Sequence, residues 1–328
     1  MGTPPAAMPF EARRAAAGWI CAACFGAAGQ ALSAAPLAYI TDQGSNDVSV
    51  VDLDAMRVVR TIGVGRSPAG IAVDAAASRA FVSNPDSKDV SVIDLKTFQV
   101  QGSLPAGSGP VGIATSPDGR RLYVADWYGN SLLAYDAISL DRLGAVAIGH
   151  APAGVAVSAD NATVYVAARD DDRVDVIDAA SLSLRSSLPA GSHPFALGIS
   201  PDGHRLWALN VLSDDASVFE LPGGRELARI SVGKAPYGIA FGQGGGRAYV
   251  TNQHAASVSV IDTAMLSVVA TWVACDYPEG IEALGDRVFV VSWMQDSLCV
   301  HDARSGARTA EVPVGRNPRG FGHFLLTP

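Results

Sequence analysis

Residues 68–94 read PAGIAVDAAASRAFVSNPDSKDVSVID, and residues 110–136 read PVGIATSPDGRRLYVADWYGNSLLAYD, the same pattern 42 positions later. Each stretch holds short runs of β-branched and aromatic residues between clusters of Asp, Asn, Ser, Gly and Pro, which is typical of strands joined by tight turns. A fixed repeat of this length predicts a solenoid, a propeller or an array of units. The repeat, rather than any single residue, therefore sets the architecture.

Three kinds of residue keep the same step through the chain, which makes a chance pattern a poor explanation. The step is 42 residues for the aromatic and acidic series and for the prolines, except for a final step of 40. The prolines are Pro68, Pro110, Pro152, Pro194, Pro236, Pro278 and Pro318; the aromatic residues are Tyr39, Phe81, Tyr123, Tyr165, Trp207, Tyr249 and Phe289; the acidic residues are Asp52, Asp94, Asp136, Asp178, Glu220, Asp262 and Asp302.

Each unit contains four short β-rich runs, which we letter A to D. In one unit they are Gly70–Val73, Ala80–Ser83, Val90–Asp94 and Gln99–Leu104. No helical period extends beyond a turn, so we predict an all-β chain. Strand B is the most regular run, with the sequences AYIT, AFVS, LYVA, VYVA, LWAL, AYVT and VFVV.

These strand-B sequences resemble the repeat of the YVTN-repeat (YncE-like) β-propeller family, and the resemblance extends from about Leu37 to Leu326. The resemblance implies a β-propeller in an extracytoplasmic location, and it implies no particular catalytic activity. The WD40 propellers have a similar period, but their Gly-His and Trp-Asp signatures do not recur with the repeat in this sequence.

The two ends of the repeat region complement each other. The first unit, Leu37 to Arg66, lacks an A strand, whereas Arg319 to Leu326 form an A-like strand with nothing after it. We therefore predict a seven-bladed β-propeller with four antiparallel strands per blade, in which the C-terminal strand completes blade 1. This closure removes the exposed sheet edge that an open array would leave.

Residues 1–34 do not belong to the repeats and predict a secretory signal peptide. Arg13 and Arg14 precede an apolar run from Ala15 to Ala28, and small residues follow, with cleavage expected near Ser33 or Ala34. The apolar run is short for a membrane span. We therefore expect residues 35–328 to be the mature propeller, soluble in the periplasm or secreted.

The charge of the mature chain argues against general nucleic-acid binding. Removing Glu11, Arg13 and Arg14 with the signal peptide leaves 22 basic and 31 acidic side chains. General phosphate binding needs a net basic surface or a large basic stripe.

Two cysteines, Cys275 and Cys299, remain after Cys21 and Cys24 leave with the signal peptide. An even number in an oxidising compartment predicts a disulfide. If two strands lie between these residues, the thiols stay unpaired, so buried free thiols are an alternative, as is a metal or redox role.

The B–C loops and the D–A connections share one face of a propeller, and positions that vary there between blades are candidates for function. The candidates beside the prolines and in the B–C loops are Arg66, His150, His193, Tyr237, Tyr277, Glu279, Arg316, Arg319, Trp127 and Trp293. Arg66, Arg316 and Arg319 could together hold a carboxylate or a phosphate. Solvated rim charges and aromatics packed on neighbouring loops are the alternatives.

Catalytic and metal-binding motifs are mostly missing. There is no Gly-x-Ser-x-Gly, no His-Glu-x-x-His and no phosphate-binding glycine loop. Glu279 is better suited to binding than to acting as a base. His150, His193 and His254 come from different blades without a short ligand spacing, so we expect no metal and no cofactor.

These observations favour a monomeric binding module over an enzyme, with a small anionic ligand or a partner protein on the loop face. Two alternatives follow from the propeller resemblance. One is a scaffold subunit of a periplasmic quinoprotein-type dehydrogenase, in which a separate small subunit carries the cofactor. The other is a lactonase-like hydrolase.

Overall fold

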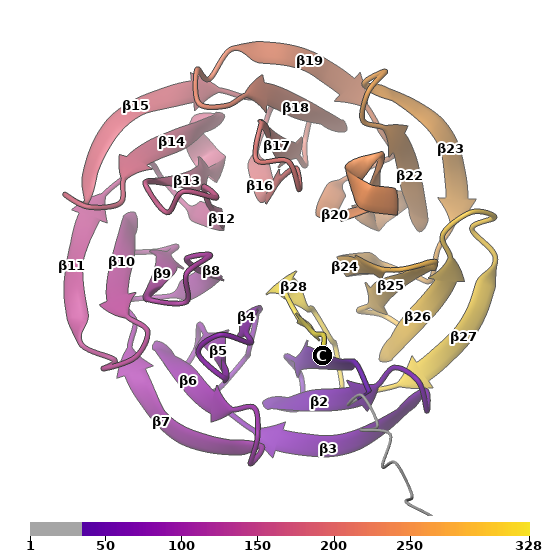
Figure 1. Ribbon diagram of the computed structural model, residues 1–328, viewed down its shortest axis with the longest axis horizontal. Helices are drawn as coiled ribbons and strands as arrows, with labels where there is room; N and C mark the ends of the chain where they lie inside the picture. Colours follow the sequence, from indigo (N-terminus) through magenta and orange to yellow (C-terminus); the bar gives the residue numbers. More distant parts are fainter. Residues whose placement is uncertain (1–34) are drawn as a thin grey trace, which may run out of the picture. The chain divides into compact units, whose positions relative to one another are not determined.

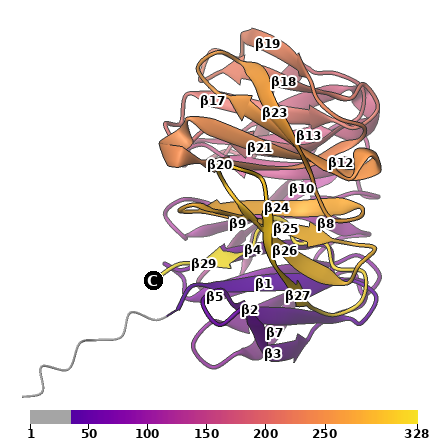
Figure 2. The ribbon, with the colours of Figure 1, turned by 90° about the vertical axis from the view of Figure 1, so that its right-hand side faces the viewer.

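Antiparallel sheets follow one another along the chain and stand around a common axis, so that they close into a ring (Figure 1). The computed structural model describes residues 35–328; the predicted signal peptide lies outside the described residues. These residues form seven sheets, which confirms the predicted seven-bladed β-propeller. From the side, the innermost strands run between two faces at which the connecting loops gather (Figure 2).

The first two blades contain the two ends of the described chain. Blade 1 consists of β1 (Leu37–Asp42), β2 (Asp47–Asp52), β3 (Arg57–Gly63) and the C-terminal β29 (Leu325–Leu326). Blade 2 consists of β4 (Gly70–Asp74), β5 (Arg79–Asn84), β6 (Asp89–Asp94) and β7 (Gln99–Pro105), with β28 (Phe321–His323) beside β4.

The other five blades are regular four-stranded units, numbered from the channel outward. Blade 3 has β8 (Pro110–Thr115), β9 (Arg121–Asp126), β10 (Ser131–Asp136) and β11 (Arg142–Ala147). Blade 4 has β12 (Pro152–Val157), β13 (Thr163–Ala168), β14 (Arg173–Asp178) and β15 (Ser183–Pro189). Blade 5 has β16 (Pro194–Ile199), β17 (Arg205–Asn210), β18 (Asp215–Glu220) and β19 (Glu226–Ser231). Blade 6 has β20 (Pro236–Gly242), β21 (Arg247–Asn252), β22 (Ser257–Asp262) and β23 (Ser267–Val273). Blade 7 has β24 (Pro278–Leu284), β25 (Arg287–Ser292), β26 (Ser297–Asp302) and β27 (Arg308–Pro313).

Three short 3-10 turns complete the secondary structure of the described residues: η1 (Arg169–Asp171), η2 (Gln243–Gly245) and η3 (Gln253–Ala255). The turns η1 and η3 lie in B–C loops, and η2 lies in an A–B turn.

The repeated residues build the ring, as their constancy between blades indicates. The strand-B aromatics are buried between neighbouring blades. A Cβ at Gly112 would lie 1.8 Å from the carbonyl oxygen of Ala153 in the next blade, so only glycine lets these inner strands come so close. The carboxylate of Asp136 accepts hydrogen bonds from the N–H groups of Ile138 and Ser139 and so closes the C–D turn.

The proline positions are held by a hydrogen bond that crosses from blade to blade. The residue before five of the prolines has a positive φ and donates its N–H to an Asn or Asp side chain 21 residues earlier, in the B–C loop of the preceding blade. The pairs are Ser67 with Asn46, Ala151 with Asn130, His193 with Asp172, Ala235 with Asp214, and Asn317 with Asp296. This contact aligns the D–A connections that form the loop face.

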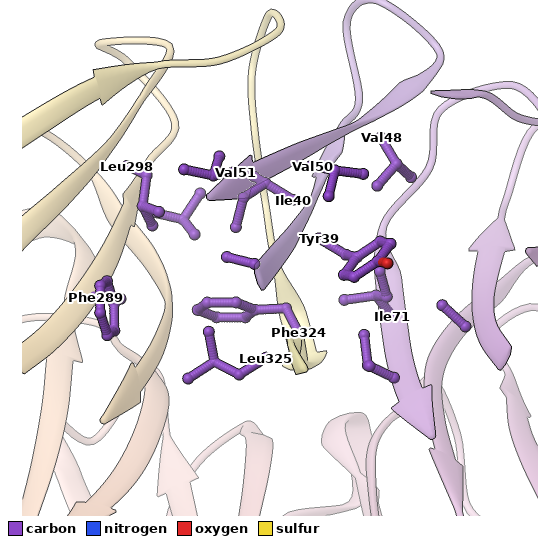
Figure 3. Packing of buried hydrophobic residues seen from close by; sticks show 14 of the residues in the cluster. Tyr39, Ile40, Val48, Val50, Val51, Ile71, Phe289, Leu298, Phe324 and Leu325 are labelled. Carbon is purple, nitrogen blue, oxygen red and sulfur yellow. The ribbon is translucent and has the colours of Figure 1, made fainter. Parts of the chain in front are cut away.

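The C-terminal strand completes blade 1, as predicted, but it does so irregularly. In blade 3 Leu122 pairs with Thr115, five residues after Pro110; in blade 1 the equivalent Ala38 pairs with Leu325, seven residues after Pro318. The two extra residues make Phe321–His323 bulge toward the channel and pair with β4 in parallel instead. The side chains of Phe324 and Leu325 then fill the core between Phe289 and Tyr39 (Figure 3).

Candidate functional site

A cavity of about 800 Å³ opens at the centre of the face that carries the B–C loops and the D–A connections. All seven blades contribute lining residues. The chain ends at the opposite face (Figure 2), because β29 is the last part of an inner strand that starts near Pro318 on the loop face.

A buried polar cluster lies at the base of this cavity. Glu279, directly after Pro278 at the start of β24, is 0% exposed. Its Oε2 accepts a hydrogen bond from Arg319 Nε at 3.0 Å, and its Oε1 accepts one from Gln253 Nε2 at 2.9 Å. Burial raises the pKa of Glu279, and the charge of Arg319 opposes that shift. A buried carboxylate with this set of donors is a satisfied ion pair rather than a free base.

Two aromatic rings, Phe195 and Tyr237, close the base of the cavity, and a third, Phe321, packs against them from the channel on the other side. The Phe195 ring lies 4.6 Å from Tyr237 and 4.8 Å from Phe321, measured between ring centroids. Phe195 and Tyr237 follow Pro194 and Pro236, whereas Phe321 is brought inward by the bulge of the closing strand. The three side chains are all at least nine-tenths buried. Phe195 and Tyr237 form an apolar floor, backed by Phe321.

Further aromatic residues form the walls above this floor. Tyr277 and Trp293 lie 5.5 Å apart on blade 7, and Trp127 lies 6.2 Å from Phe195. The guanidinium of Arg169 sits over the Trp127 ring at 5.4 Å from its centroid. That of Arg319 sits over Tyr237 at 5.9 Å. Such cation–π contacts hold both the arginine and the ring in place.

Two buried hydrogen-bond donors of the lining have no partner: the Tyr237 hydroxyl and Trp293 Nε1. Burial raises the pKa of Tyr237, and the nearby Glu279 carboxylate adds to the shift, so the hydroxyl keeps its proton. Buried donors without acceptors cost free energy, about 1–3 kcal/mol each. The cavity therefore offers hydrogen bonds that the folded chain does not use.

A family model of YNCE-like β-propellers matches residues 134–327, well over half of the chain. The chain belongs to the YNCE-like β-propeller family. No curated protein matches the sequence significantly.

Several solved structures share the fold of this YNCE-like chain over most of the chain's length. Hydrazine synthase of Kuenenia stuttgartiensis superposes with a TM-score of 0.74 at 19% identity, covering 88% of this chain and 100% of that chain. A functionally unknown protein from Desulfotomaculum acetoxidans gives 0.78 at 16% identity, covering 89% and 98%. The dihydro-heme d1 dehydrogenase NirN, in complex with DHE, gives 0.67 at 16% identity, covering 89% and 75%. At these identities the likeness concerns the fold alone.

This YNCE-like propeller brings six of the ten candidate residues to the cavity: Trp127, Tyr237, Tyr277, Glu279, Trp293 and Arg319. The other four are held elsewhere on the loops. The guanidinium of Arg66 donates to the carbonyl oxygen of Asp86, and that of Arg316 donates to the carbonyl oxygen of Gly44. His150 Nδ1 contacts Asp171 at 2.8 Å, and His193 Nε2 lies 3.7 Å from Asp170.

The predicted group of three arginines is thus divided. Among Arg66, Arg316 and Arg319, only Arg319 lines the central cavity, and it is already paired with Glu279. Arg66 borders a separate depression between Pro85 and Tyr128. The repeat correctly predicted that all three lie near the prolines. Each guanidinium, however, bonds to a different partner: Asp86 for Arg66, Gly44 for Arg316 and Glu279 for Arg319.

Sequence reasoning missed Gln253 at the cavity and Phe321 beneath it, and it expected Phe195 at the channel mouth without naming it as a candidate. Gln253 is the residue directly after strand B of its blade, a position that also holds Trp127 and Trp293. Phe195 directly follows Pro194, as Tyr237 follows Pro236. Both signals were present in the repeat, whereas Phe321 packs beneath the cavity floor only through the irregular closing strand.

The structure differs from expectation at the cysteines, where Cys275 and Cys299 are buried free thiols rather than a disulfide. Both belong to the apolar cluster between blades 6 and 7, and Val290, the pairing partner of Cys299, offers its carbonyl oxygen to the Cys275 thiol at 3.9 Å. The disulfide stays a prediction. Counting thiols in denatured, unreduced chain that begins at residue 35 tests it, since two thiols would contradict the bond.

Residues 35–328 contain no group of three or more His, Cys, Asp or Glu side chains placed to hold a metal ion. The same residues contain no helix long and apolar enough to cross a membrane.

Proposed function

We propose that this YNCE-like propeller is a binding module whose loop-face cavity takes up a ligand. The observation that supports this proposal most directly is the polar cluster of Glu279, Arg319 and Gln253 under a set of aromatic walls. Concave sites with apolar walls and a few convergent polar groups are the usual form of ligand sites. A packed core would bury only apolar side chains there, at lower cost in free energy.

The cavity chemistry favours binding over hydrolysis. The Arg319 charge and the hydrogen bonds to Glu279 stabilise its ionised form, which opposes the uptake of a proton from water or from a nucleophile. Turnover of lactones by the isolated chain would contradict this assignment and favour the hydrolase alternative.

A cavity-filling pair of variants tests the proposal. Val211 lines the cavity and its neighbour Leu212 points to solvent with 61% exposure. Compounds that raise the melting temperature of the unmodified chain should lose that effect in Val211→Trp and keep it in Leu212→Trp. Equal responses of the two variants would place binding outside the cavity.

A partner protein on the same face is the second candidate, favoured by exposed apolar side chains around the cavity. Tyr128, Leu212 and Met294, in the B–C loops of blades 3, 5 and 7, are 73%, 61% and 60% exposed. Apolar side chains grouped on a surface often mark a protein contact. A scaffold subunit of a dehydrogenase would use such a contact, and copurification of a quinone- or haem-bearing protein, lost in Leu212→Asp, would support it.

We also propose that the chain is exported. The support is the basic, apolar and small-residue order of residues 1–34. Amino-terminal sequencing of protein recovered from the periplasm or the medium should begin near Ala34 or Ala35. A cytoplasmic protein that still begins at Met1 would contradict export.

A further inference from the structure

We infer that the loop-face cavity selects a flat, ring-containing carboxylate; this inference rests on the proposed binding function and names its ligand class. The starting point is whether the free hydrogen-bonding groups at the base of the cavity are donors or acceptors. The groups there that lack a partner are donors, whereas the carboxylate of that cluster is already satisfied. A complementary ligand must therefore bring acceptors.

Three donors can converge on such acceptors. Trp293 Nε1 is buried and has no hydrogen-bond partner, and the Tyr237 hydroxyl makes no hydrogen bond of good geometry although the Glu279 carboxylate lies beside it. Arg319 uses Nε and Nη2 on Glu279, which leaves its third nitrogen, Nη1, for a further acceptor. A carboxylate accepts several hydrogen bonds at once, and a charged acceptor makes each of them stronger.

The walls specify a flat ring rather than a small ion. Phe195 and Tyr237 form the floor, backed by Phe321, and Trp127 and Trp293 stand above it on opposite blades. Aromatic faces of this kind stack on other flat rings. At about 800 Å³ the cavity is large enough for a ligand of two or more fused rings.

Aromatic walls beside a carboxylate also suit organic cations, which is the main rival class. Here the two cation–π positions are already taken, by Arg169 over Trp127 and by Arg319 over Tyr237. The charge of Glu279 is neutralised by Arg319 at 3.0 Å. A cationic ligand would thus meet two fixed guanidinium groups and no free carboxylate in the cluster.

Calorimetric titration with three probes separates these classes: 2-naphthoate, 2-naphthylmethylammonium and acetate. We expect the full chain to bind 2-naphthoate, which has both a ring system and a carboxylate. Acetate lacks the ring and 2-naphthylmethylammonium has the opposite charge, so both should bind at least about tenfold more weakly.

Two variants and one control assign the binding to this cavity. Tyr237→Phe and Trp293→Phe each remove one donor and keep an aromatic ring, so each should weaken 2-naphthoate binding by about tenfold without lowering the melting temperature. Tyr165→Phe removes a hydroxyl from strand B of blade 4, which does not line the cavity, and should leave the affinity unchanged. Equal affinity in Tyr237→Phe, Trp293→Phe and the unmodified chain would overturn the inference.

The outcomes also distinguish the ligand class from the binding function. If 2-naphthylmethylammonium binds as tightly as 2-naphthoate, and Val211→Trp abolishes both, the cavity is a binding site but the carboxylate class is wrong. If no probe binds at millimolar concentration, the ring-carboxylate class is overturned, and the binding function is then tested separately by the Val211→Trp and Leu212→Trp comparison.

Discussion

His301 occupies a strand-C position where the other blades place Val51, Ile93, Tyr135, Ile177, Phe219 and Ile261. The side chain is 1% exposed; its Nδ1 contacts the carbonyl oxygen of Gly306 at 3.0 Å, and its Nε2 has no partner. Burial lowers the pKa of this imidazole, so the ring is neutral with Nδ1 protonated. Its Nε2 lone pair is then a buried acceptor without a donor.

Replacing His301 by Ile should therefore stabilise the fold. Removing an unsatisfied buried acceptor gains about 1–3 kcal/mol, from which the loss of the bond to Gly306 subtracts part. Urea denaturation measures the difference. The reciprocal variant Ile261→His is the matched comparison and should destabilise blade 6; stabilisation by both variants would show that the unpaired nitrogen is not the cause.

At the residue scale, the repeat predicted site positions better than side-chain partners. Glu279 and Tyr277 stood out because most other blades carry small or apolar residues beside the proline, and both line the cavity. The sequence did not show that Arg66 and Arg316 bond to nearby carbonyl groups. Position in a repeat fixes where a Cα lies, whereas the direction of a long side chain depends on its local contacts.

The hydrogen bond that holds the prolines is missing at two places. Gly109, before Pro110, donates its N–H to Asp126 instead, and the B–C loop of blade 6 has no Asn or Asp at the matching position. Tyr277 precedes Pro278, but the residue 21 positions before it is Ala256 rather than Asn or Asp. Ala256 has φ 44°, in the left-handed region that alanine adopts only at a cost of about 1–2 kcal/mol. The loop at the edge of the cavity is thus held less firmly than its equivalents.

Ala256→Asn should restore this contact and stabilise the chain by about 1 kcal/mol, because Asn tolerates the left-handed region and offers an acceptor to the Tyr277 N–H. Thermal and chemical denaturation measure the gain. Asn130→Ala, which removes the equivalent bond to Ala151, is the matched opposite change and should lose a similar amount. A neutral or destabilising Ala256→Asn would contradict the role assigned to this bond.

At the element scale, the strands and their order could be predicted because alternating apolar residues and turn residues recur in every unit. The final strand was predicted as a regular inner strand and is not one. Gly322, with φ 115°, allows a backbone path that other residues rarely adopt, and a Cβ there would lie 2.3 Å from the carbonyl oxygen of Ile71. With one copy of this segment, the repeat offered no comparison that could reveal the bulge.

Closure of the ring is a property of the whole molecule, and it depends on few residues. In β29 two residues, Leu325 and Leu326, pair with β1, and Pro318 adds an isolated bridge to Asp42. Phe324 is 0% exposed within the core cluster that joins blades 7, 1 and 2. Deleting residues 321–328 should lower the melting temperature of the entire ring, because β1 becomes an open edge and the cluster loses its central side chains. Retained melting behaviour would contradict this topology.

A point substitution separates packing from strand pairing in this closure. Phe324→Ala keeps the backbone and should cost about 3–5 kcal/mol, as expected for a large side chain removed from a packed core. Leu326→Ala, at a half-buried position of the same strand, should cost clearly less. Chemical denaturation of the two variants gives the comparison.

The acidic turns give the whole molecule a defined acid sensitivity. Hydrogen bonds from turn N–H groups lower the pKa of Asp94, Asp136, Asp262 and Asp302. They lower that of Asp178 to about 2, from an ordinary value of 3.8, with Ser181 as the main donor. Because the folded pKa lies below the unfolded one, this stabilisation is complete above the unfolded pKa and is lost as the pH falls toward the folded value.

The melting temperature should thus fall steeply between about pH 4 and pH 2. In Asp178→Asn the side chain at position 178 cannot ionise. The melting temperature should then fall less steeply with pH, by the contribution of this one carboxylate. Melting curves recorded at several pH values test both statements. A variant with an unchanged slope would exclude Asp178 as one of the groups that titrate on unfolding.

The ring is open to solvent at both faces, yet Phe321 separates its two hollows. The loop-face cavity and the channel on the other side, about 460 Å³, share no lining residue, and the Phe321 ring packs against Phe195 and Tyr237 between them. The central space is consequently closed at Phe321 and is not a continuous channel through the ring. Whatever enters the cavity must leave by the same opening, so a protein bound over the B–C loops would control both arrival and release with a single contact.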